Sequence, residues 1–206
     1  SALAAEDIQD SMVRDLSVLF PNAPRPLVHE TIHFLNHNRL LVVTDRLTIV
    51  DLGTMEKVAE IPNPIPNNES FDFSVRDRVY QLQSGFSYIT ERSDNGNLLQ
   101  YYFQFDDELN VVREFMMSDK KPEVPESFVP DYATMDVSPD GKDIYYFGFA
   151  MTSGLYRLNL DTDEHTLLYA TTHDASLNTL LEIWLINDGK TILFEQSDWV
   201  GGPNFE

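Results

Sequence analysis

Five consecutive residues near the N-terminus match the H-E-x-x-H pattern: His29, Glu30, Thr31, Ile32 and His33. On a helix, this spacing places both histidines on one face, one turn apart, where they can bind a zinc ion. The glutamate then acts as a general base on the metal-bound water, which is the chemistry of a metal-dependent hydrolase. The pattern predicts that chemistry only if the segment is helical.

The surrounding sequence favours a β-hairpin in this segment. Its centre is β-branched, prolines precede it, and the apolar run Leu40 to Val43 follows within a few residues. On a strand, His29 and His33 would lie roughly 13 Å apart, which is too far to share one zinc ion. A helix from Leu27 to Asn36 is the alternative, in which His29, Glu30 and His33 would form the metal site.

Two acidic turns carry the carboxylate oxygens that calcium prefers. One runs from Asp106 to Glu108, and the other runs from Asp161 to Glu164. Neither has the Asp-x-Asp-x-Asp-Gly spacing of a calcium-binding loop. Ordinary hydrogen-bonded turns are therefore expected, with calcium as the alternative.

Other residues that could do chemistry have ordinary structural interpretations. His173, Asp174 and Ser176 have the residue types of a catalytic triad, but adjacency in sequence does not build one, and no G-x-S-x-G turn is present. Trp184 and Trp199 are typical of packing between sheets rather than of stacking on a ligand. The sequence therefore predicts no catalytic residue and no cofactor, with zinc and calcium as the alternatives.

The composition of the chain excludes several classes of partner. Its 206 residues include 34 Asp and Glu against 14 Lys and Arg, for a formal net charge of −20. Nucleic acid and anionic membrane surfaces need a basic footprint, and the longest basic run is Lys120-Lys121. No cysteine is present, which excludes disulfides and a thiol nucleophile. No apolar run reaches the ~20 residues of a membrane-spanning helix.

The elements that would position these residues recur at a fixed spacing. Three segments share one strand-turn-strand pattern 54 residues apart: Leu47 to Ile61, Tyr101 to Phe115 and Leu155 to Tyr169. Each runs from an alternating apolar strand through an acidic turn into a second strand, which is typical of the outer hairpin of a β-propeller blade. We therefore expect an all-β fold of the β-propeller class.

Turns and proline-rich connections set the expected boundaries. Residues 1–26 form an N-terminal arm, with an amphipathic helix over Ala5 to Phe20 and a proline-rich linker. Residues 27–206 form the propeller segment. Its blades are expected at 27–66, 70–118, 129–170 and, as a partial blade, 177–206.

The third blade carries a resemblance to a known family. The run from Met135 to Tyr169 contains S-P-D-G-K at residues 138–142, followed by an apolar strand and an acidic turn. It resembles the repeat of TolB-like and related WD-like bacterial propellers, although Asp163 stands where that repeat usually has glycine. In the S-P-D-G turn, proline fixes the first dihedral, Asp bonds locally and glycine accepts a positive φ, so the resemblance implies a blade and no chemistry.

The sequence predicts fewer blades than a closed β-propeller ring usually has. One further period after Leu155 would place the next outer hairpin beyond Glu206, the last residue. Propellers close rings of roughly 4 to 8 blades, and about three and a half are expected here. We therefore expect an incomplete ring that further blades or a partner chain completes. A homodimer of two half-rings is one version, and an open β-array is the alternative.

These features lead to an expected function and an alternative. We expect a non-catalytic propeller segment that binds a protein or assembles with other chains. Ala2-x-Ala4 resembles the end of a secretory signal peptide, which predicts a periplasmic or secreted protein. The alternative is part of a propeller enzyme, either a metal-dependent hydrolase that uses His29, Glu30 and His33 or an oxidoreductase subunit.

Overall fold

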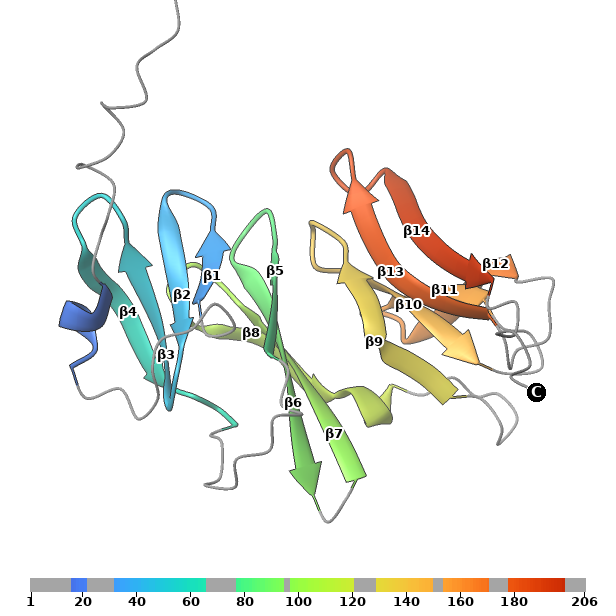
Figure 1. Ribbon diagram of the computed structural model, residues 1–206, viewed down its shortest axis with the longest axis horizontal. Helices are drawn as coiled ribbons and strands as arrows, with labels where there is room; N and C mark the ends of the chain where they lie inside the picture. The colour runs from blue at the N-terminus through green and yellow to red at the C-terminus, as the bar shows by residue number, and fades with distance from the viewer. Residues whose placement is uncertain are drawn as a thin grey trace, which may run out of the picture. The chain divides into compact units, whose positions relative to one another are not determined.

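A computed structural model describes residues 16–21, 32–65, 77–94, 97–120, 129–149, 154–170 and 178–198. This part of the chain is all-β, as the sequence predicts, with fourteen strands in four antiparallel sheets and no α-helix (Figure 1). Among these residues, no sheet closes on itself. The chain divides into two compact units, Ser1–Asn68 and Glu69–Glu206.

The first unit holds one four-stranded sheet, sheet A, whose strands pair in chain order. They are β1 (Ile32–Leu35), β2 (Arg39–Val43), β3 (Arg46–Asp51) and β4 (Glu56–Pro62). The central strands β2 and β3 are buried along most of their length, which explains their continuous apolar sequence. One face packs on the N-terminal arm, where Leu40, Val42 and Val50 meet Leu16, Leu19 and Phe20.

The described part of the N-terminal arm is shorter than the predicted helix. Residues 5–15 lie outside the described part, and the remainder forms the 3-10 helix η2 (Leu16–Leu19). Pro21 follows, and proline cannot continue a helix because it has no amide hydrogen. A tightened 3-10 turn is common where a helical segment ends.

The second unit holds three further sheets. Sheet B pairs its strands in chain order: β5 (Asp77–Gln81), β6 (Phe86–Asp94), β7 (Asn97–Phe105) and β8 (Val111–Met116). The 3-10 helix η4 (Met117–Asp119) follows it. Sheet C has the same order: β9 (Val129–Val137), β10 (Asp143–Phe149), β11 (Gly154–Asn159) and β12 (Glu164–Ala170). Sheet D contains two strands, β13 (Asn178–Ile186) and β14 (Thr191–Asp198).

Sheets B, C and D stack face to face through two apolar cores. Successive side chains of a strand point to opposite faces, so Tyr146 of β10 enters the B–C core and Phe147 enters the C–D core. The B–C core consists of Leu82, Ile89, Tyr102, Met117, Met135, Val137, Ile144, Tyr146, Leu158 and Leu160. The C–D core consists of Phe147, Leu155 and Ile183, with Tyr145, Ile192 and Phe194 packed against it.

The three segments predicted from the 54-residue spacing form hairpins of one kind. Strands β3, β7 and β11 end 54 residues apart, at Asp51, Phe105 and Asn159. Each following turn holds one residue in the left-handed region, namely Met55, Leu109 and Asp163 with φ of 57°, 66° and 57°. A side-chain oxygen stabilises each turn by accepting backbone N–H groups, and it belongs to Asp51, Asp106 or Asn159.

The hairpin between β5 and β6 depends on a glycine, which gives a first prediction. Gly85 has a φ of +78°, and an added Cβ would overlap the carbonyl oxygen of Phe105. We expect Gly85→Ala to lower the free energy of unfolding by more than about 1 kcal/mol. Gly53→Ala is the matched control, because the nearest atom to its Cβ is a side-chain oxygen of Asp51 at 3.2 Å. Urea denaturation of both variants tests this, and equal losses would contradict it.

Candidate interaction surface

The H-E-x-x-H segment leads into a strand in the structure. Ile32–Leu35 forms β1, and His33 lies opposite Leu41 of β2. The turn between them places His37 and Asn38 at φ of 60° each, as a tight hairpin requires. The hairpin interpretation is therefore confirmed from Ile32 onward, and His33 does not lie on a helix. His29 and Glu30 lie outside the described residues, so the zinc alternative is not tested.

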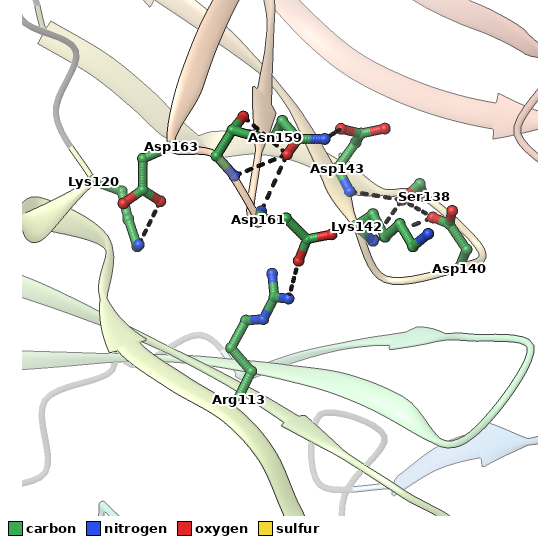
Figure 2. Close-up of polar contacts among 10 residues, drawn as sticks. Arg113, Lys120, Ser138, Asp140, Lys142, Asp143, Asn159, Asp161 and Asp163 are labelled. Carbon is green, nitrogen blue, oxygen red and sulfur yellow. Dashed lines mark hydrogen bonds and ion pairs between the residues drawn. The ribbon is translucent and has the colours of Figure 1, made fainter.

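The carboxylates of the acidic turn between β11 and β12 form ion pairs that join sheets B and C. Figure 2 shows Arg113 of β8 pointing to Asp161, with the guanidinium 2.5 Å from the carboxylate. In the same way, the ammonium group of Lys120 lies 2.5 Å from the carboxylate of Asp163. Across the described ranges, no three His, Asp or Glu side chains gather as they would around a metal ion.

The other acidic turn is closed by its own hydrogen bonds. The carboxylate of Asp106 accepts the side-chain N–H of Asn110 at 2.9 Å and the backbone N–H groups of Glu108 and Asn110. These bonds, led by that from the Asn110 side chain, lower the pKa of Asp106. A carboxylate held in this way stabilises its turn, which is the ordinary interpretation of the sequence.

The S-P-D-G-K turn also has a structural role. The hydroxyl of Ser138 donates to Asp140 at 2.7 Å and accepts the backbone N–H groups of Lys142 and Asp143 (Figure 2). The bond from Ser138 is the main cause of the lowered pKa of Asp140. Gly141 takes the positive φ of +69° that the sequence predicts.

Three partly buried polar contacts link strands, two of them between sheets and the third within sheet C, and the sequence carries no signal for them beyond alternation. The hydroxyl of Tyr80 in β5 donates to the carbonyl of Met135 in β9 at 2.9 Å, and burial raises its pKa to about 12. The backbone N–H of Leu185 in β13 donates to Asp136 of β9 at 2.7 Å. Burial raises the pKa of Asp136. These bonds position neighbouring sheets, and none forms a catalytic constellation.

The third contact joins His165 of β12 to Tyr146 of β10, with 2.6 Å between Nδ1 and the hydroxyl. Burial lowers the pKa of His165, and a hydrogen bond to the backbone of Lys120 offsets part of this effect. Lys120 comes after the last strand of sheet B in the chain. Neutral His165 therefore connects the end of sheet B to sheet C. The protonated form is disfavoured because it would lose hydration.

The outward face of sheet D carries exposed apolar side chains beside two exposed glutamates, Glu182 and Glu195. Trp184 and Leu193 lie directly opposite each other on β13 and β14, and they alternate with Ile183 and Phe194, which face sheet C. Trp184 is 41% exposed, Leu193 48% and Ile186 38%. The prediction that Trp184 packs between sheets is therefore not met, since no described residues form a layer over this face. Trp199, His173, Asp174 and Ser176 lie outside the described residues.

Comparisons with known proteins add no function for this surface. No protein-family model matches the chain, and no curated protein sequence matches it. The likeness to TolB-like propellers therefore remains a resemblance that one blade carries. Within the described ranges, no helix has the length and apolar character needed to cross a membrane.

The pKa of His165 gives a second prediction. Because this pKa is lowered in the folded state, the unfolded state takes up the proton first as the pH falls. The stabilisation by neutral His165 is fully present above its unfolded pKa of about 6.5 and is lost as the pH falls toward the folded pKa. We expect the stability difference between wild type and His165→Gln to shrink from about pH 8 to about pH 5.

Urea denaturation of the two proteins at each pH provides the measurement. The many carboxylates of this acidic chain titrate in both proteins, so the difference between them isolates His165. A difference that stays constant over this range would show that His165 is not held neutral in the folded state.

Proposed function

We propose that this chain is a non-catalytic, propeller-type module that binds a protein and is completed by further blades or a partner chain. One observation carries the proposal. The outward face of sheet D exposes an apolar cluster that no described residues cover, although the stacking of sheets B, C and D is continuous up to that point. An open apolar layer at the end of such a stack is typical of an interaction site.

Three features support a propeller-type arrangement. Sheets A, B and C are four-stranded antiparallel meanders in chain order, which is the form of a blade. Within the second unit the sheets pack face to face, and sheet C is covered on both sides. The outer hairpins recur every 54 residues with the same left-handed turn position. In a ring of blades every sheet has two neighbours, so sheet D would need one more.

The chemistry of the surface favours a protein partner over a small substrate. The tryptophan and aliphatic side chains of Trp184, Ile186 and Leu193 are of the kind that anchor protein interfaces. The acidic turns that the sequence offers for metal binding are occupied by ion pairs or local hydrogen bonds. The Ala2-x-Ala4 segment supports a role outside the cytoplasm, in the periplasm or after secretion.

Site-specific photocrosslinking in the native host tests the proposal. A photoreactive phenylalanine derivative replaces Leu193 in one strain and Val112 in another. Val112 of β8 is the matched control, because it is exposed and apolar but lies on an edge strand of sheet B. We expect Leu193 to form a covalent adduct with one defined polypeptide, and Val112 to form none.

The pattern of adducts decides the outcome. Mass spectrometry of the Leu193 adduct identifies the crosslinked peptide and shows whether it belongs to another protein or to this chain. Adducts at neither position, or equal adducts at both, would refute a binding role for the outward face of sheet D.

A further inference from the structure

The face of sheet C that packs on sheet D is only partly covered by described residues. Phe147 and Leu155 are buried beneath β13 and β14. Tyr169 lies on the same face, opposite Leu155, yet it is 43% exposed. Its ring contacts Phe194 of β14, with 5.2 Å between the ring centroids. Sheet D therefore packs on β9, β10 and β11 of sheet C and leaves Tyr169 of β12 partly exposed.

Two polar atoms on that face are buried without a hydrogen-bond partner among the described residues. They are Nε of Arg157 and Oγ1 of Thr166. The two residues lie directly opposite each other on β11 and β12. Arg157 follows Leu155 by two positions, so its side chain shares the face that packs on sheet D. Because an unpaired buried polar group is destabilising, this site favours an additional group that bonds to both.

The edge of β14 that faces away from β13 is free in the part of the chain that the structure describes. There β14 pairs only with β13, whereas β10 and β11 of sheet C each pair on both sides. A free strand edge presents unpaired N–H and C=O groups that accept an additional strand. The four-stranded form of sheets A, B and C shows that two more strands fit this architecture.

We propose that an extended basic segment of another polypeptide adds to sheet D along the free edge of β14. This inference rests on the proposed function and specifies its binding mode and partner. The inward side chains of the added strand cover Tyr169 and bond to Arg157 and Thr166. The outward side chains extend the apolar and acidic face of sheet D, next to Leu193 and Glu195.

Charge selects a basic segment over a second copy of this chain. Glu182 and Glu195 lie directly opposite each other on the exposed face, where like charges are destabilising. A lysine or arginine beside Glu195 relieves that repulsion. A second copy would instead bring another formal charge of −20 to the same surface.

Two synthetic peptides test the proposal with the full chain. Each has about 8 residues, a typical strand length. The basic peptide alternates Lys with Thr and Val, and the acidic peptide has Glu in place of Lys. Fluorescence anisotropy measures affinity, and amide hydrogen exchange locates the bound peptide. We expect only the basic peptide to bind, and to slow exchange selectively within residues 191–198.

Matched variants separate edge binding from general charge attraction. Glu195→Lys should weaken binding of the basic peptide at least about 3-fold, which lies within the range of one exposed ion pair. Glu114→Lys, an exposed glutamate on edge strand β8, makes the same change of charge and should leave affinity nearly unchanged. Arg157→Met should also weaken binding, because it removes the buried donor.

Several results would overturn the inference. They are equal binding of both peptides, no binding of the basic peptide, or binding without slowed exchange in β14. Slowed exchange in β14 that grows with protein concentration alone would assign the edge to a second copy. A Leu193 crosslink to another protein together with unprotected β14 amides would support binding by the face of sheet D and refute strand addition.

Discussion

The fold of the second unit depends on alternation of apolar side chains in strands that are covered on both faces. Tyr146 and Phe147 are neighbours in sequence, yet they belong to different cores on opposite sides of sheet C. Each strand of a middle layer therefore contributes to two interfaces, and its stability depends on both neighbouring sheets. The same alternation leaves one face of sheet D, the last layer, without a neighbouring sheet among the described residues. Sheet D buries Ile183 and Phe194 against sheet C, while Trp184 and Leu193 face outward.

Polar contacts between sheets determine how neighbouring sheets are positioned relative to each other. Tyr80 binds the backbone of Met135 between sheets B and C, and Asp136 binds the backbone N–H of Leu185 between sheets C and D. A buried hydrogen bond adds modest net stability, but an unmade one is costly, so such contacts select one relative position of two apolar faces. Ion pairs from Arg113 and Lys120 continue this junction at its exposed rim. Since their carboxylates are at least half exposed, these pairs contribute less to stability than to alignment.

Described residues cover one apolar face of sheet A but leave the outward face of sheet D exposed. On sheet A, η2 supplies Leu16 and Leu19 to cover Leu40, Val42 and Val50. On sheet D, no described segment does the same for Trp184 and Leu193. Nε of Arg157 and Oγ1 of Thr166 have no hydrogen-bond partner among the described residues, and β14 pairs there only with β13. Adding a strand along β14 pairs the free edge and brings polar groups toward these atoms, whereas the face of Trp184 and Leu193 remains available for a second contact.

Local sequence determined the elements of this protein, and the tertiary structure decided how they are used. The spacing of 54 residues, the S-P-D-G turn and the alternating runs predicted the strands and hairpins, because short-range sterics and hydrogen bonds govern turns and strand faces. Those signals could not show that Trp184 is exposed, because its exposure depends on which sheet lies opposite. They also could not show that His165 contacts Tyr146, because that contact depends on how the strands of sheet C pair. The acidic turn at Asp161 shows the same limit. Its carboxylates suggested calcium in isolation, and only the approach of Arg113 and Lys120 from another sheet turned them into ion pairs.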